Sequence, residues 1–160
     1  MTLGETVLSK LAEWRPAGSG RHIFRHADAG NGWTISLAIE KADDLSCRLS
    51  EVTCERAAGK EPDLKSWANA LARRVTGLME PLKVIEIDER RNEAILRSDE
   101  PTTRGHRRSH YELKLHGNRR AVLTRFAADA EPAAKRASIA FVLTHESLGK
   151  FIDDLTGPIA

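Results

Sequence analysis

An apolar stripe with helical spacing, between residues 63 and 79, constrains the fold of this chain more than any other feature. The stripe recurs at intervals of three and four residues and comprises Leu64, Trp67, Ala68, Leu71, Val75, Leu78 and Met79. Asp63 is a suitable N-cap, and Gly77 and Pro81 bracket the expected end of the helix. Because a helix of this length is marginal in water on its own, we expect the stripe to pack on a β-sheet.

Alternating apolar and polar residues predict strands on both sides of this helix. We expect strands at residues 21–27, 33–40, 45–54, 82–88, 93–98, 110–116, 119–127 and 139–143. In the third expected strand, every second residue faces inward from Leu45 onward, and this alternation then shifts by one residue. Such a shift predicts a β-bulge near Ser50 and Glu51. Hairpin turns are expected at the glycine-containing and asparagine-containing segments, and polar loops at residues 99–105 and 129–135.

Two further amphipathic helices are predicted at the ends of the chain. Thr2 and Glu5 have the spacing of a capping box, ahead of an apolar stripe that runs from Leu3 to Trp14. Thr144 is the expected N-cap of the last helix, whose stripe consists of Leu148, Phe151, Ile152 and Leu155. All three tryptophans of the chain fall on apolar positions, so we expect them in the core.

The order helix, three strands, helix, five shorter strands, helix predicts an α+β fold. We expect a single antiparallel, strongly bent sheet of about six to eight strands, with the three helices packed largely on one face. With 160 residues, of which 41% are hydrophobic, the chain can bury one core. We therefore expect a single α+β domain over residues 1–160.

This element order, taken over most of the chain, resembles that of the type III secretion chaperones. Those proteins place a helix before three strands, a second helix, more strands and a closing helix. They are typically acidic dimers, whereas this chain has a pI near 8.7 and an additional hairpin. The resemblance implies an architecture and carries no function with it.

Composition and hydropathy favour a cytoplasmic protein without a membrane span. Glu5 and Glu13 interrupt the first fifteen residues, and all apolar runs are far shorter than the roughly 20 residues that cross a bilayer. Cys47 and Cys54 are seven residues apart in one expected strand, a separation of about 23 Å. We therefore expect two free core thiols in a reducing cytosol, too far apart to share a metal ion.

Positive charge is concentrated in residues 104–125. This segment holds six arginines and Lys114 against Glu112, an excess of +6 in a chain whose net charge is +2. The arginines are Arg104, Arg107, Arg108, Arg119, Arg120 and Arg125. A basic hairpin of this kind can bind nucleic acid or another polyanion, and the alternative is a solvated surface that balances acidic strands.

Histidine pairs four residues apart are the first candidate metal ligands. His22 and His26, like His106 and His110, have the spacing that brings two imidazoles together on a helix. In a strand the same spacing separates them by about 13 Å, so we expect no metal and no cofactor. A site at His106 and His110 stays open if the intervening loop curls.

The triplet Glu112, Leu113 and Lys114, with Asp99 ahead of it, is a second candidate. It resembles the Asp…Asp/Glu-x-Lys pattern of restriction-type nucleases, which implies two carboxylates that hold a divalent metal and a lysine that assists the attacking water. The Pro-Asp pair usual in those nucleases occurs here at Asp63, which is already expected to cap a helix. The alternative is a polar outer face of the sheet.

These observations favour binding over catalysis. The sequence holds no nucleophile elbow, phosphate loop or dinucleotide fingerprint, so we expect the protein not to be an enzyme. Our leading hypothesis is a non-catalytic protein-interaction domain, adaptor-like or chaperone-like, that is cytosolic and binds a protein partner or forms a homodimer. Three amphipathic helices compete for one sheet face, and a stripe left uncovered would need a partner. The alternative is polyanion binding by residues 104–125, with nuclease-like, metal-dependent cleavage.

Overall fold

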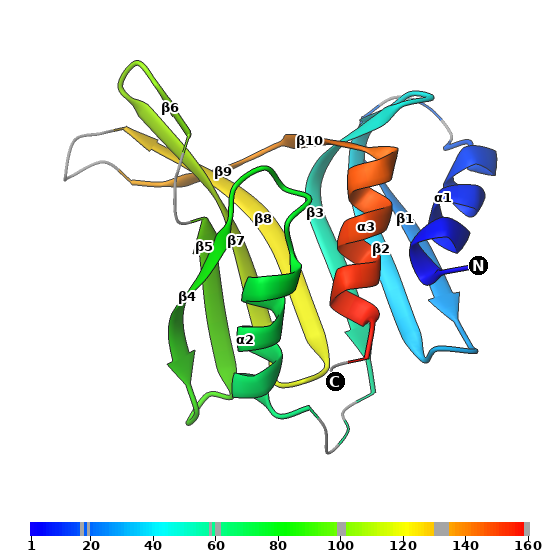
Figure 1. Ribbon diagram of the computed structural model, residues 1–160. Coiled ribbons are helices and arrows are strands. Elements are labelled where there is room, and N and C mark those ends of the chain that lie inside the picture. The colour runs from blue at the N-terminus through cyan, green and yellow to red at the C-terminus, as the bar shows by residue number, and fades with distance from the viewer. Residues whose placement is uncertain are drawn as a thin grey trace.

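The computed structural model describes residues 1–16, 18, 20–57, 59, 62–98, 102–129 and 135–158 (Figure 1). This part of the chain forms three helices and a ten-stranded antiparallel sheet, which confirms the predicted α+β class with a single sheet. The helices are α1 (Leu3–Glu13), α2 (Leu64–Arg74) and α3 (His145–Thr156). The strands are β1 (His22–Asp28), β2 (Trp33–Ala42), β3 (Ser46–Arg56), β4 (Leu82–Asp88), β5 (Glu93–Ser98), β6 (Thr102–Arg104), β7 (Arg107–His116), β8 (Arg120–Asp129), β9 (Ala137–Ile139) and β10 (Phe141–Thr144).

The main path of the sheet runs β1-β2-β3-β8-β7-β5-β4. The two halves of the chain meet where residues 52–55 of β3 pair with residues 120–123 of β8. Beyond that point β10 pairs with the first part of β3, and β9 pairs with the last part of β8. The last two strands of the chain are therefore inserted between its two halves.

The predicted bulge lies where β3 changes partners. Ala38 opposes Glu51 and Ile39 opposes Leu49, so Ser50 is the extra residue on β3. A bulge bends its strand and increases the local twist. Here it separates the half of β3 that pairs with β8 from the half that pairs with β10.

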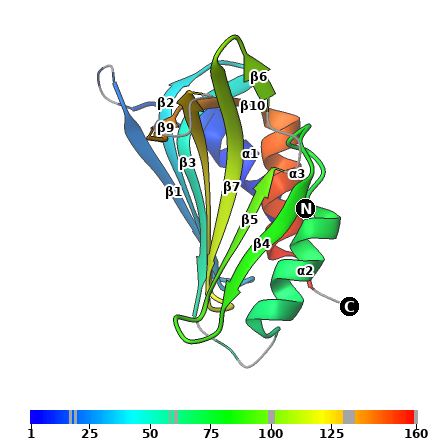
Figure 2. The ribbon, with the colours of Figure 1, turned by 90° about the vertical axis from the view of Figure 1, so that its left-hand side faces the viewer.

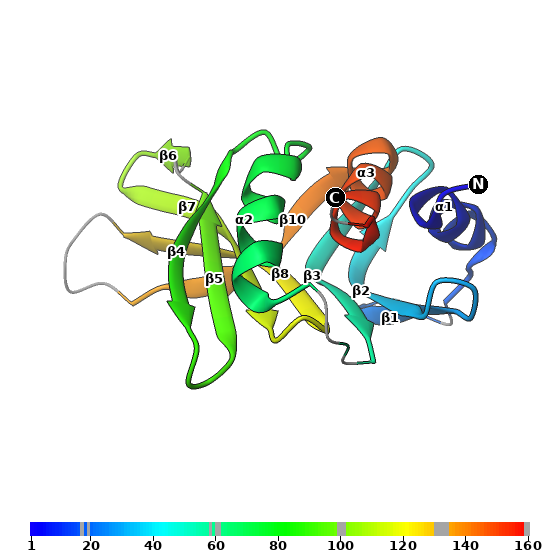
Figure 3. The ribbon, with the colours of Figure 1, turned by 60° about the horizontal axis from the view of Figure 1, so that its bottom comes forward.

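All three helices lie on one side of the sheet, as Figure 2 shows from the edge. α2 packs over β4, β5 and β7, whereas α3 packs over β3 and β10, and α1 packs against α3 and β1. Figure 3 shows α2, α3 and α1 in a row along the sheet. The other side of the sheet carries no helix in the described part of the chain.

The apolar stripes of the helices are buried in one hydrophobic core. Trp67 and Leu71 of α2 are 1% and 0% exposed, as a helix packed on the sheet requires. Leu11 of α1 and Phe151 of α3 are buried in the same core. The described structure therefore accommodates all three helices, and an uncovered helix stripe is no longer a reason to expect a partner.

The central helix is shorter than its apolar stripe predicts. α2 ends at Arg74, and Val75 is its C-cap in an extended conformation. Met79 was expected on the buried face and is instead 96% exposed. The physical reason is the low helix propensity of Thr76 and Gly77, after which the chain turns toward β4.

Three segments of the sheet also differ from expectation. Leu45 is 78% exposed, because Asp43 Oδ1 accepts hydrogen bonds from the backbone N–H groups of Leu45 and Ser46 (2.8 and 2.9 Å) and holds a turn there. Residues 102–104 of the expected polar loop form β6, which pairs with β7 across a turn at Gly105. The last expected strand is divided into β9 and β10, and these short strands raise the count to ten.

Candidate functional site

The arginines of residues 104–125 lie in three separate regions. Arg104, Arg107 and Arg108 are exposed at the tip of the β6–β7 hairpin, which projects from one end of the sheet (Figure 1). We call these three residues the arginine tip. Arg119 and Arg120 lie beyond the opposite end of β7, a strand of 10 residues that spans roughly 33 Å. The predicted basic hairpin is therefore not one continuous patch.

Arg125 is half-buried on the helix side of the sheet, where it forms a bidentate ion pair with Glu80. Its side chain is 12% exposed, its Nη2 lies 2.9 Å from Glu80 Oε2, and its guanidinium lies 4.4 Å from the centre of the Tyr111 ring. Burial acts to raise the pKa of Glu80, but hydrogen bonds from Arg125 and from the hydroxyls of Ser98 and Thr102 outweigh it and lower that pKa. Arg125 therefore stabilises the fold.

Glu112 and Lys114 share one strand face, as the nuclease-like pattern predicts, and both have ion-pair partners. The Glu112 side chain is 6% exposed, and its Oε1 lies 2.9 Å from Arg136 Nη1 and 3.4 Å from Arg97 Nη2. Lys114 lies 3.0 Å from Glu93, and its hydrogen bond lowers the pKa of Glu93. The Glu112 carboxylate therefore lies between two guanidinium groups, as in a structural ion pair. Nuclease-like chemistry at this position stays a prediction.

The candidate metal ligands do not converge in the described ranges. Asp99, the remaining member of the nuclease-like set, lies outside the described residues. His106 is exposed in the β6–β7 turn, whereas His110 is half-buried on β7 with its ring 6.1 Å from that of Phe126. Burial, with a smaller contribution from Arg97, lowers the pKa of His110. Among the residues described, no three His, Cys, Asp or Glu side chains have metal-binding geometry.

The two cysteines are buried core residues, as the sequence predicts. Cys47 and Cys54 are both free and 0% exposed. Burial raises the pKa of Cys47 to about 11 and that of Cys54 to about 12. Neither thiol is ionised at neutral pH, so neither is a candidate nucleophile.

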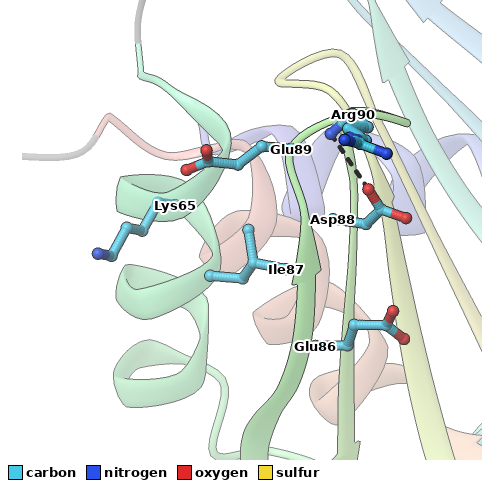
Figure 4. Close-up of a pocket in the computed structure, with 6 residues that line it drawn as sticks. All are labelled: Lys65, Glu86, Ile87, Asp88, Glu89 and Arg90. Carbon is cyan, nitrogen blue, oxygen red and sulfur yellow. Dashed lines mark hydrogen bonds between the residues drawn. The ribbon is translucent and has the colours of Figure 1, made fainter.

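A shallow pocket of about 400 Å³ beside the β4–β5 turn contains acidic residues that do not converge. It is lined by Lys65 of α2 and by residues 86–90. Figure 4 shows Ile87 on the side of β4 that faces Lys65, whereas Glu86 and Asp88 point away from that helix. The strand divides the carboxylates between its two sides, so the pocket offers no cluster for chemistry.

On the side of the sheet without helices, which we call the helix-free face, the carboxylates of Glu51 and Glu55 on β3 flank a group of small, uncharged side chains. The small side chains come from β2, β3 and β8 and alternate with core residues: Thr34, Ser36, Ala38, Thr53, Val122 and Thr124. In one row Ser36 lies opposite Thr53, which lies opposite Val122. Arg25 on β1 and Lys114 on β7 continue this row at either side.

A cleft of about 650 Å³ lies on the helix side, between the end of α1, the start of β1, the end of β2 and the start of α3. Trp14, His22 and His145 line it. From the sequence, Trp14 was expected in the core, and the two histidines gave no sign of sharing a site. No local spacing signals this group, because its members come from elements far apart in the chain.

Comparison of the chain with protein-family models, with curated proteins and with solved structures finds no match in any of the three. Among the described residues, no helix is both long enough and apolar enough to cross a membrane.

Proposed function

We propose that this protein is a non-catalytic protein-interaction domain, adaptor-like or chaperone-like, that forms a homodimer in the cytosol through its helix-free face. The observation that carries the proposal is the row of small, uncharged side chains formed by Ser36, Thr53 and Val122, which lies between Glu51 and Glu55 on β3. All three helices pack on the other side, so this row stays uncovered by any helix in the described ranges. Several charged residues that could have supported catalysis are used in ion pairs instead.

The size and chemistry of the helix-free face suit a dimer interface. Seven strands along the main path, spaced by about 4.8 Å, give a width of roughly 29 Å, and strands of about seven residues span roughly 24 Å. The face therefore covers about 700 Å², close to the roughly 800 Å² that each partner buries in a standard interface. Short side chains in the row of Ser36, Thr53 and Val122 allow a second sheet to approach to about 10 Å, with Glu51 and Glu55 at the two sides of this row.

Light scattering coupled to size-exclusion chromatography tests the proposal. The wild type, with a chain mass of 17.7 kDa, is expected to elute as a dimer of about 35 kDa. Ser36→Arg places a long charged side chain at the centre of the helix-free face, so we expect this variant to be a monomer. Ser9→Arg, on the exposed side of α1, is the matched control and is expected to remain a dimer.

Two results would contradict this proposal in different ways. A wild type that stays monomeric at high concentration would rule out the homodimer. A Ser36→Arg variant that remains as dimeric as Ser9→Arg would show that the interface lies elsewhere.

A second candidate function is polyanion binding by the arginine tip. Arg104, Arg107 and Arg108 are exposed on a projecting hairpin, and they form no ion pair with any other described residue. Three free guanidinium groups on adjacent strands can contact successive phosphate or sulfate groups. This surface is much smaller than the hairpin of six arginines that the sequence suggests.

Heparin chromatography separates the arginine tip from the other basic residues. We expect wild-type protein to be retained at low salt, and the triple variant Arg104→Ala, Arg107→Ala, Arg108→Ala to elute at a clearly lower salt concentration. The double variant Arg119→Ala, Arg120→Ala removes charge at the far end of β7 and should elute close to the wild type. Equal elution of the triple variant and the wild type would exclude the arginine tip as the binding site.

A further inference from the structure

The cleft at the end of α1 has the size and the lining of a small-molecule site. Its volume of about 650 Å³ falls within the range of roughly 300–1,000 Å³ typical of ligand pockets. It lies on the helix side of the protein, away from both the helix-free face and the arginine tip. A ligand there would be independent of the two functions proposed above.

One wall of the cleft is aromatic and aliphatic. Trp14 is half-buried, with its ring 6.3 Å from that of His22 at an interplanar angle of 77° and 5.8 Å from that of Phe24 at 89°. Leu11 and Ile39 continue this wall with aliphatic carbon. A fixed indole beside aliphatic side chains is a suitable surface for a flat ring.

The cleft also holds two imidazole nitrogens without a hydrogen bond. The Nε2 atoms of His22 and His145 are buried and have no hydrogen-bond partner among the residues that the structure describes. Buried polar atoms in proteins nearly always have a partner, and leaving one without it is costly. In a neutral imidazole, Nε2 donates a hydrogen bond in one tautomer and accepts one in the other. A ligand edge that carries an N–H group next to a ring nitrogen can therefore bond either tautomer.

The charged rim of the cleft does not favour anions. Glu40, Asp43 and Asp44 line it together with Arg15 and Lys41, and Glu40 is paired with Arg48 at 3.4 Å, so the rim has no excess of positive charge. Backbone hydrogen bonds from the residues that follow Asp43 lower its pKa and keep it ionised at neutral pH. The rim therefore offers no added attraction to a phosphate or a sulfonate on the ligand.

We propose that this cleft binds a heteroaromatic amine of nucleobase size that is uncharged or cationic. Its ring packs against Trp14, and its amino edge becomes the hydrogen-bond partner of His22 and His145 once their imidazoles turn toward it, because both Nε2 atoms are shielded from solvent in the empty cleft.

Adenosine is a suitable probe, because it combines a purine ring and an amino group with an uncharged sugar. We expect saturable binding below about 1 mM by isothermal titration calorimetry. Binding should shift the indole N–H resonance of Trp14 in NMR spectra, whereas Trp33 and Trp67, which are 4% and 1% exposed, should not respond. Adenosine monophosphate should bind no more tightly than adenosine, because the rim has no excess of positive charge to hold its phosphate.

Variants on one strand provide the matched control. His22→Phe keeps an aromatic ring beside Trp14 but removes Nε2, and we expect it to weaken adenosine binding about tenfold. His26→Phe makes the same change on β1 outside the cleft and should leave the affinity unchanged. The proposal is overturned if adenosine shows no saturation up to about 10 mM, if the resonance of Trp14 does not move, or if a folded His22→Phe variant binds like the wild type.

Discussion

The partly buried pair of Glu80 and Arg125 joins three segments that are far apart in the chain. Glu80 precedes β4, Arg125 belongs to β8, and the hydroxyl of Thr102 on β6 donates a hydrogen bond to Glu80 Oε2 at 2.8 Å. Both charged side chains are 12% exposed, so removal of one leaves the other partly buried without its partner. The pair holds the projecting hairpin to the loop that follows α2.

We expect Glu80→Gln to lower the free energy of unfolding by about 2 kcal/mol at pH 7, because Arg125 loses its counter-charge at a partly buried position. The pKa of Glu80 is lowered in the folded state. Its stabilisation is therefore complete above the pKa of an unfolded glutamate, about 4.3, and is lost as the pH falls through the lower folded value.

Urea unfolding of the wild type and Glu80→Gln over a range of pH checks this prediction. The difference between the two proteins should shrink in acid. Glu86→Gln, on the exposed edge strand β4, is the control and should change stability by less than about 0.5 kcal/mol. A difference that is independent of pH would contradict the role of the Glu80 carboxylate.

The two thiols should be unreactive in the native protein. With a pKa of about 11 for Cys47 and about 12 for Cys54, about one thiol in a thousand or fewer is ionised at pH 8, and both side chains are shielded from solvent. We expect a thiol reagent such as DTNB to modify neither cysteine in buffer and both in denaturant. Rapid modification of the folded protein would show that the strand β3 opens readily.

Helix caps show how much the sequence can predict at the scale of residues. Thr2 accepts a hydrogen bond from the backbone N–H of Glu5 at 3.1 Å, and the Glu5 side chain completes the predicted capping box. Asp63 and Thr144 cap α2 and α3 in the same way. Each cap involves residues three apart, so the relevant contact is present in the local sequence.

At the scale of elements, α1 and α3 approach closely because both carry glycine at their crossing. A Cβ atom added at Gly4 would meet the backbone oxygen of Gly149 at a distance far below van der Waals contact. The backbone N–H of Gly4 also donates a hydrogen bond to Asp153 Oδ1 at 2.7 Å. The N-terminal helix is thereby fixed to the C-terminal one.

We expect Gly4→Ala to lower the free energy of unfolding by about 2 kcal/mol, because the added methyl group must separate two backbones. Gly77→Ala is the control for the same change: its nearest neighbour, Lys150 Cδ, lies at an ordinary 3.5 Å. This control should be neutral or stabilise the protein by up to about 1 kcal/mol. Thermal or urea unfolding checks both variants, and equal stabilities would show that the helices do not cross at Gly4.

The strands were predicted best where a turn residue marked their ends. β4 and β5 have the predicted bounds, and their connecting turn uses Asp88 Oδ1 as acceptor for the backbone N–H of Arg90 at 3.1 Å. Asp28 makes the same contact with Gly30 at 2.9 Å in the β1–β2 turn. β6 was missed because its three residues are polar and exposed. Although β6 pairs with β7, its sequence shows no alternation of apolar and polar residues that would indicate a strand.

At the scale of the whole molecule, the two halves of the chain depend on each other. The first helix and three strands end at β3, whose partners β8 and β10 come from the C-terminal half. α3, the last helix, covers β3 and packs against α1. The N-terminal half therefore cannot complete its core without the end of the chain.

We expect the complete chain to unfold in a single transition, with coincident curves from tryptophan fluorescence and circular dichroism. A fragment of residues 1–57 should be unfolded, because it lacks the strands and the helix that cover β3. Far-UV circular dichroism of this fragment checks the second point. A fragment that folds alone, or two separated transitions for the complete chain, would contradict the prediction of one domain.

The sequence by itself determined the three helices, their caps, the bulge at Ser50 and most of the strands. Each of these depends on residues within one helical turn or one hairpin, where spacing decides which side chains share a face. Only the tertiary structure decided the strand order, the separation of the arginine tip from Arg125, and the meeting of Trp14 with His22 and His145 in one cleft. These arrangements depend on contacts between distant parts of the chain, and such contacts leave no periodic pattern in the local sequence.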